Sequence, residues 1–176
     1  RVHPTLVPEK RLVANVDGAM NAVLVQGNMV GPTLYYGAGA GSEPTASAVA
    51  ADIIDIARQS KLSNKTLIPT LGFMPDKIQK KNILSIEDIF SEFYLRFTME
   101  NKAGLLAKIT QIFAEHEISI NSMVHKEVQE DNQNPDIFLI TSKTKESDIN
   151  AIINEIELLP ENIEKIVKIR TEDLKK

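Results

Sequence analysis

The chain has 176 residues, a net charge of -4 and a pI near 5.5, so it lacks the basic surface that nucleic-acid binding requires. Its apolar fraction of 43% is typical of a globular protein with one ordinary domain or two small ones. The absence of cysteine excludes disulfides, thiolate catalysis and cysteine-ligated metal sites, and no metal site is expected. No segment resembles a signal peptide or a membrane span. We therefore expect a cytoplasmic protein without a membrane partner.

The chain begins with Arg1 rather than methionine, and we expect it to be a piece of a longer protein. Two short apolar runs, residues 21–27 and 30–36, predict a hairpin whose first strand is buried. The Gly31-Pro32 pair predicts that the second strand is regular only in its later half. Apolar residues at helical spacing over 45–58 predict an amphipathic helix. We expect its apolar face either to pack against another copy or to be poorly ordered.

Residues 61–91 show no clean periodicity, and we interpret them as a linker between two domains. Beyond them the pattern becomes regular and changes between periods of two and of 3.6 residues. Expected strands cover 92–98, 118–124, 136–141 and 163–170, and expected helices cover 105–113 and 148–159. This βαββαβ order predicts a ferredoxin-like sandwich. The fold class is therefore α+β, with a partial α+β segment, hairpin plus helix, before the sandwich.

The segment Met99-Glu-Asn-Lys-Ala-Gly-Leu-Leu106 resembles the turn between the first strand and first helix of ACT domains, which sense amino acids in metabolic enzymes. Asn101 stands at that family's acidic position, Ala103 replaces its usual proline, and Gly104 is present. Ile118-Ser-Ile-Asn-Ser122 is similar to the family's second strand. The resemblance implies an effector site, which would include these six residues: Asn101, Ala103, Gly104, Leu105, Ile120 and Asn121.

The chemistry of this turn favours an anion. A glycine between strand and helix lets backbone amides face a ligand, and a helix N-terminus attracts a carboxylate such as that of an amino acid. The plain alternative is that Asn101 caps the helix and Gly104 permits the turn. A second alternative is that the ACT domain only associates subunits and binds no ligand.

A second glycine-rich stretch, Gly37-Ala-Gly-Ala-Gly41, stands before the helix over 45–58. It does not fit the dinucleotide fingerprint G-x-G-x-x-G in either register, because Ser42 or Pro44 takes the place of the third glycine. No Lys-Ser/Thr pair follows, so the stretch is not a P-loop. By itself it predicts a tight turn between a strand and a helix.

The surroundings of this turn resemble the C-terminal part of homoserine dehydrogenases of the monofunctional bacterial form. The similar segments, in order, are His3-Pro-Thr-Leu-Val7, Leu12-Val-Ala-Asn-Val16, Asn21-Ala-Val23, Tyr36 to Gly41 and Pro44 to Val49 with Asp52. In that family an ACT domain follows after a linker. The resemblance therefore implies residues 1–60 as the end of the catalytic and dimerisation domain, 61–91 as linker and 92–174 as the ACT domain.

The homoserine dehydrogenase resemblance implies an enzyme that interconverts L-aspartate 4-semialdehyde and L-homoserine with NADP or NAD, in threonine and methionine biosynthesis. It implies allosteric regulation by threonine at the ACT domain and a homo-oligomer that is at least a dimer. It places Gly41, with neighbouring Gly39 and Ala40, beside the nicotinamide cofactor. The family's Rossmann fingerprint and catalytic lysine lie upstream of the matching region. We therefore expect no catalytic residue, no activity and no bound cofactor in these residues alone.

The three histidines, His3, His116 and His125, are far apart in the sequence, and we expect surface or structural roles for them.

Overall fold

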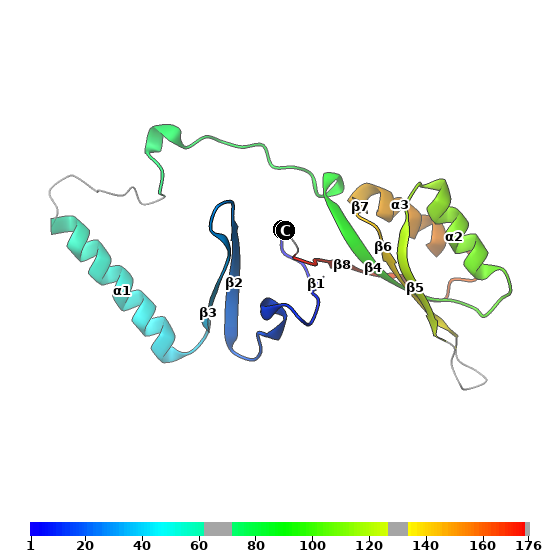
Figure 1. Ribbon diagram of the computed structural model, residues 1–176, viewed down its shortest axis with the longest axis horizontal. Coiled ribbons are helices and arrows are strands. Elements are labelled where there is room, and N and C mark those ends of the chain that lie inside the picture. The colour runs from blue at the N-terminus through cyan, green and yellow to red at the C-terminus, as the bar shows by residue number, and fades with distance from the viewer. Residues whose placement is uncertain (62–71, 127–133, 175–176) are drawn as a thin grey trace. The chain divides into compact units, whose positions relative to one another are not determined.

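The computed structural model describes residues 1–61, 72–126 and 134–174 (Figure 1). The chain forms two compact units, one made of residues 1–8 and 83–176 and the other of residues 9–82. The first unit contains a mixed sheet with two helices. The second contains a hairpin and a long helix.

The sheet of the first unit has the strand order β1-β8-β4-β6-β5. Its strands are β1 (Thr5–Leu6), β4 (Phe90–Thr98), β5 (Ile120–Lys126), β6 (Asp136–Thr141) and β8 (Val167–Thr171). Neighbouring strands are antiparallel, except that β1 runs parallel to β8. A two-residue strand, β7 (Thr144–Lys145), pairs with the start of β4. Leaving β1 and β7 aside, the order is that of a ferredoxin-like fold.

Helices α2 (Leu105–Glu115) and α3 (Glu146–Glu157) lie along one side of this sheet (Figure 1), and a short 3₁₀ helix, η3 (Ile86–Asp88), precedes β4. Every second residue of β4 is buried, because successive strand side chains point to opposite faces. The core between sheet and helices consists of these buried apolar residues: Phe93, Leu95, Phe97, Met99, Leu105, Ile109, Ile112, Phe113, Ile118, Ile137, Leu139, Ile149, Ile152, Ile156 and Ile166. Burial of this apolar surface is the main force that stabilises the unit.

The predicted βαββαβ order is confirmed, but the last strand begins four residues later than expected, at Val167. The preceding residues make other contacts: Asn162 bridges Met99, and the Glu157 carboxylate accepts the amide of Ile166 at 3.0 Å. The apolar residues between Ile163 and Ile166 therefore reflect burial of Ile166, and pairing in β8 begins only at Val167.

In the second unit, β2 (Met20–Gly27) and β3 (Gly31–Ala38) form the predicted antiparallel hairpin, with Met20 opposite Ala38 and Gly27 opposite Gly31. Short 3₁₀ helices lie at Leu12–Asn15 (η1) and Pro75–Lys77 (η2), and the predicted helix is α1 (Ser42–Lys61). The expectation that Gly31-Pro32 confines the regular strand to its later half was wrong, because β3 is paired from Gly31 to Ala38. Pro32 pairs with Gln26 because a two-stranded ladder has only edge strands, where a proline is tolerated.

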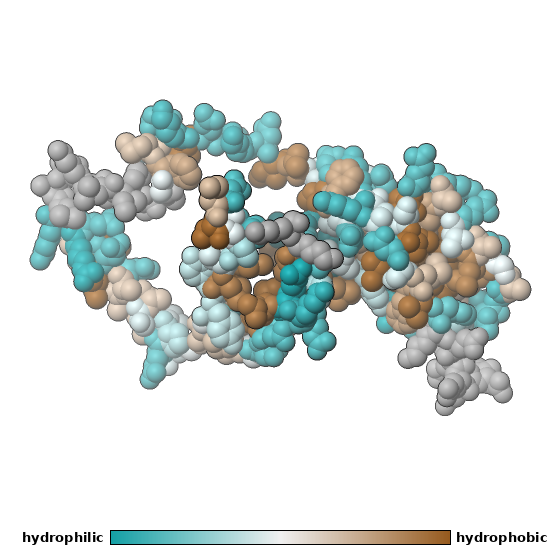
Figure 2. All heavy atoms as spheres, in the orientation of Figure 1, coloured by the Kyte–Doolittle hydropathy of each residue, from teal (hydrophilic) through white to brown (hydrophobic). Residues whose placement is uncertain are grey.

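The predicted burial of the first hairpin strand was also wrong: Val23 is 60% exposed and Val25 is 46% exposed. Figure 2 shows apolar side chains on the surface of this hairpin. No residue of α1 is buried, including Val49 and Ile53 on its apolar face. Among the described residues, no second layer covers the hairpin or this helix face. Apolar side chains whose spacing indicates burial are therefore exposed.

None of the described helices is both long enough and apolar enough to cross a membrane.

Candidate functional site

The loop between β4 and α2 has a conformation that depends on glycine. Gly104 occupies the N-cap position of α2 with φ of 84°, in the left-handed region that other residues adopt at a cost. The Leu105 amide donates to the Lys102 carbonyl at 3.2 Å, and the Lys108 amide donates to the Gly104 carbonyl at 3.1 Å. Gly104 therefore starts the helix. The alternative that Asn101 caps the helix does not hold, since the N-cap residue is Gly104 and no side chain caps the helix by a hydrogen bond.

Several amides at the start of α2 are available to a ligand. Within the described parts of the chain, the amides of Ala103, Gly104 and Leu106 donate to no protein acceptor. The first amides of a helix lack intrahelical partners and carry the positive end of the helix dipole. An anion such as a carboxylate suits this position.

A pocket of about 370 Å³ lies against this loop. It is lined by Asn101 to Leu106, which are the end of the loop and the first residues of α2, together with His125 of β5 and Pro135 and Ile137 at β6. His125 of β5 is paired with Ile137 of β6, and this pairing places the histidine in the pocket lining opposite the loop. The lining combines aliphatic side chains with an amide, an imidazole and a backbone turn. Such a pocket suits a small molecule with one charged end and one apolar end.

Four of the six residues assigned to the effector site from the sequence line this pocket: Asn101, Ala103, Gly104 and Leu105. Ile120 and Asn121 do not. They lie at the start of β5, next to an irregularity in its pairing with β6. There the Asn121 side chain donates to the Thr141 carbonyl at 3.1 Å, and Ile120 packs against the core.

Five pocket residues were not assigned from the sequence, namely Lys102, Leu106, His125, Pro135 and Ile137, and His125 is the one that carries an imidazole. The sequence carries no signal for the place of His125 in the pocket, because that place depends on its pairing with Ile137 in the sheet. The other two histidines contact nearby groups: His116 lies 3.0 Å from Glu155, and His3 lies 2.9 Å from the Thr5 hydroxyl. Among the described residues, no cluster of histidine and acidic side chains has the arrangement needed to hold a metal ion.

Charged groups fix the base of the loop. The Glu161 carbonyl accepts the Glu100 amide at 2.9 Å, and the Glu161 carboxylate accepts Lys108 Nζ of α2 at 2.6 Å. The hydrogen bond from Lys108 lowers the pKa of Glu161. The second carboxylate oxygen of this buried residue has no partner among the described groups. On the loop itself, the hydrogen bond and ion pair with Glu100 raise the pKa of Lys102.

The glycine-rich turn between β3 and α1 combines a close side-chain contact at Gly39 with an unusual backbone conformation at Gly41. A Cβ at Gly39 would overlap Nδ2 of the Asn21 side chain, and the Gly39 amide donates to the Ala19 carbonyl at 3.1 Å. Gly41 has φ of 129°, and its carbonyl accepts the Thr45 amide at 3.2 Å in the first turn of α1. The backbone conformation of Gly41 therefore favours glycine, whereas a Cβ at Gly39 would require the Asn21 side chain to move. Together with Ala40 the two glycines form an exposed surface that carries only one side-chain methyl.

The strands β8, β4, β6 and β5, the two helices and the loop that ends at Gly104 define an ACT-type module. Residues 93–161 match the family model described as ACT domain, and residues 1–54 match the one described as homoserine dehydrogenase. A homoserine dehydrogenase of Neisseria gonorrhoeae is 47% identical over 99% of this chain, and one of Pseudomonas aeruginosa is 44% identical over 99%. Each match covers 40% of the relative, so the chain spans about two fifths of their length.

Among solved structures, a homoserine dehydrogenase from Thiobacillus denitrificans is similar over 99% of this chain and 39% of its own, with a TM-score of 0.88 and 51% identity. One from S. aureus is 25% identical, with a TM-score of 0.56 over 97% of this chain and 37% of its own. The chain belongs to the homoserine dehydrogenase family and corresponds to a segment of these oxidoreductases together with their ACT domain.

Proposed function

We propose that these residues act within a homoserine dehydrogenase that interconverts L-aspartate 4-semialdehyde and L-homoserine with NADP or NAD. The family membership and the matching relatives support this assignment. The ACT domain binds an amino-acid effector and regulates the enzyme, with threonine, an end product of the pathway, as the effector. The enzyme works in amino-acid biosynthesis in the cytoplasm.

The pocket beside Gly104 carries the effector proposal. It places the amides of Ala103 and Gly104, which have no acceptor among the described residues, next to the side chains of Asn101 and His125. The amides suit the α-carboxylate of an amino acid, and the aliphatic lining from Leu105 and Ile137 suits a small side chain with a methyl group. Ile120 and Asn121 lie away from this pocket, and a role for them requires a second subunit.

The proposal is tested by calorimetric titration of the chain with threonine, methionine, isoleucine and glycine. Threonine is expected to bind and to raise the midpoint of thermal unfolding further as its concentration increases, because it binds the folded state. Asn101→Ala and Ala103→Val are expected to weaken binding, whereas Asn154→Ala, at an exposed position on α3, leaves it unchanged. Absence of heat and of a thermal shift with all four amino acids would refute effector binding.

For the cofactor, we propose that Gly41, with Gly39 and Ala40, forms one wall of the nicotinamide site. The exposed and nearly side-chain-free backbone of this turn fits the approach of a flat ring. The cofactor would supply the hydride, and this turn would only shape the space around it. In a homoserine dehydrogenase that contains the Rossmann domain, Gly41→Val should weaken NADPH binding measured by fluorescence titration, whereas Gly37→Ala should not.

A second role, subunit association without a ligand, has one observation in its favour. Strand β5 is the last strand of the sheet, and its side chain Val124 is 57% exposed. An unpaired strand edge is a template for pairing with another chain. We propose at least a dimer, and sedimentation of the chain with and without threonine separates the two roles. A stable dimer whose sedimentation does not change when threonine is added would favour subunit association without a ligand.

A further inference from the structure

The opposite edge of the same sheet is already occupied by a strand from the other family segment. Strand β1 lies within residues 1–54, which match homoserine dehydrogenase, yet it extends the ACT sheet beyond β8. Thr5 is in register with Arg170 and Leu6 with Thr171, and the Glu172 amide donates to the Leu6 carbonyl at 2.9 Å. The sequence pattern that predicts the βαββαβ order gives no sign of this strand.

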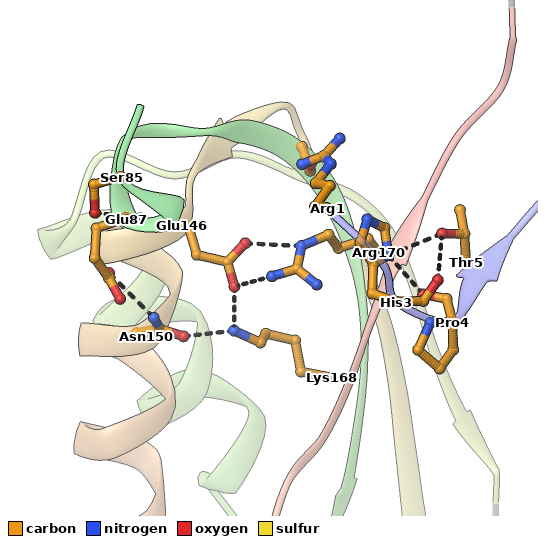
Figure 3. A network of polar contacts seen from close by, with 11 residues as sticks. Arg1, His3, Pro4, Thr5, Ser85, Glu87, Glu146, Asn150, Lys168 and Arg170 are labelled. Carbon is orange, nitrogen blue, oxygen red and sulfur yellow. Dashed lines mark hydrogen bonds and ion pairs between the residues drawn. The ribbon is translucent and has the colours of Figure 1, made fainter. Parts of the chain in front are cut away.

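Two paired residues form too short a ladder to be stable alone, so side chains must support it. Arg1 provides that support at the entry to β1. Its guanidinium lies 3.0 Å from the Glu172 carboxylate and donates to the hydroxyl of Ser91, a buried residue of β4, at 3.1 Å. Within the segment, the His3 ring lies 2.9 Å from the Thr5 hydroxyl (Figure 3). The contacts of residues 1–6 therefore involve both β8, through strand pairing, and β4, through Ser91.

The acceptor strand is itself fixed from the helix side. Lys168 and Arg170 of β8 both reach the Glu146 carboxylate at the start of α3, as Figure 3 shows, and Lys168 also donates to Asn150 at 2.6 Å. Thr5 is paired with Arg170, so β1 meets β8 at the residue that binds α3. A displacement of α3 would move β8 and, with it, the edge that β1 occupies.

The chain that leaves β1 enters residues 9–82 at Glu9 and returns to the first unit at Ile83. We infer that the outer edge of β8 is the docking surface by which the ACT domain holds the homoserine dehydrogenase segment through β1. Residues 9–82 are then attached to the ACT unit at both of their ends. This attachment is separate from effector binding and does not require it.

The absence of cysteine makes a cross-linking test specific. Paired strands lie about 4.7–4.9 Å apart, within the Cα separation that a disulfide spans. In the full chain, Leu6→Cys with Thr171→Cys is expected to form an intramolecular disulfide on mild oxidation. Leu6→Cys with Val124→Cys, on the other edge strand, is the matched control and should remain reduced. Equal cross-linking of both pairs, or none in the first pair, would overturn the inference.

The Arg1 contact gives a second comparison. Glu172→Gln in the double-cysteine chain is expected to slow disulfide formation about two- to fivefold, the effect of losing a partly exposed ion pair. Glu164→Gln removes an exposed carboxylate that makes no ion pair among the described residues and should change nothing. Identical rates for the two variants would show that Arg1 does not hold the strand.

If the cysteine pairs do not fold, hydrogen exchange answers the same question. Leu6→Pro removes an amide hydrogen from β1 and should speed exchange of the Glu172 amide about tenfold, which corresponds to the loss of one hydrogen bond. Val2→Pro lies outside β1 at an exposed position and serves as the control. An unchanged Glu172 rate in Leu6→Pro would mean that β1 is not docked on β8.

Discussion

The guanidinium of Arg170 binds the buried carboxylate of Glu146 with two hydrogen bonds, from Nη2 to Oε1 at 2.6 Å and from Nε to Oε2 at 2.9 Å. Lys168 Nζ adds a third at 2.6 Å, and the Glu146 side chain is only 3% exposed. Burial alone raises the pKa of Glu146, but the hydrogen bonds from Lys168 and Arg170 outweigh it and hold the pKa below its ordinary value. The carboxylate thus fixes the start of α3 to the last long strand of the sheet.

Glu146→Gln should therefore destabilise the ACT unit. The substitution leaves two cations facing an amide in a buried place, and breaking one side of such a cluster costs about 3–5 kcal/mol. Urea unfolding followed by far-ultraviolet circular dichroism measures the loss. Glu155→Gln removes a carboxylate whose partner is a single histidine, and its change should stay within about 0.5 kcal/mol. Equal effects of the two substitutions would show that the Glu146 cluster does not stabilise the fold.

The same carboxylate predicts how stability depends on pH. The pKa of Glu146 is lower in the folded chain than in the unfolded one, so its contribution is complete above the ordinary glutamate value of about 4.3 and is lost as the pH falls through the folded value. Unfolding free energies measured between pH 7 and pH 3 should fall more steeply for the unsubstituted chain than for Glu146→Gln. Parallel curves would contradict the lowered pKa.

Gly104→Ala should disturb the pocket loop through its backbone. An added Cβ meets no atom within 4 Å, so the cost comes from the left-handed φ of 84° and amounts to about 1–2 kcal/mol. The loop amides should shift and threonine should bind more weakly in calorimetry. Gly37→Ala is the matched control, because its φ is not positive and its Cβ also meets nothing. A similar loss of threonine affinity in both variants would show that the conformation of the Gly104 loop does not control binding.

The two units should respond differently to truncation of large side chains. Phe97 is completely buried, and Phe97→Ala should cost about 3–5 kcal/mol through lost apolar burial and the cavity it leaves. Tyr35 of the hairpin is 66% exposed, and Tyr35→Ala should change the free energy of unfolding by about 0.5 kcal/mol or less. Thermal unfolding of each variant checks this. A large effect at Tyr35 would mean that the hairpin is covered in solution.

Residues 1–176 alone should not oxidise NADPH in the presence of aspartate semialdehyde. The sequence has no dinucleotide fingerprint, and none of its lysines stands in the context of the family's catalytic lysine. Absorbance at the reduced-nicotinamide band measures turnover, with an intact homoserine dehydrogenase as the positive control. Turnover by this chain that survives further purification would refute the prediction.

The sequence predicted the parts of the structure that depend on local pattern. Alternation in Phe90–Thr98 and helical spacing in Leu105–Glu115 follow from which faces are buried, so strands and helices could be assigned directly. The loop could be located as well, because a glycine at a strand-to-helix turn has a specific backbone role, confirmed by the φ of Gly104.

Burial could not be predicted where the covering surface is absent from the described residues. The hairpin and α1 carry the apolar pattern of buried elements, yet Val23 and Ile53 are exposed. The hydrophobic pattern of a segment indicates which face needs to be covered, but it does not show which surface covers that face.

Only the tertiary structure decided which distant residues meet. It brought His125 to the loop at Gly104, placed Glu146 beneath Arg170, and set Thr5 beside Arg170 at the sheet edge. These contacts depend on strand order and register, which arise from packing of the whole unit and leave no local periodicity. The sequence by itself therefore determined the elements, the family and the loop, whereas the pocket lining, the buried ion cluster and the docked strand required the fold.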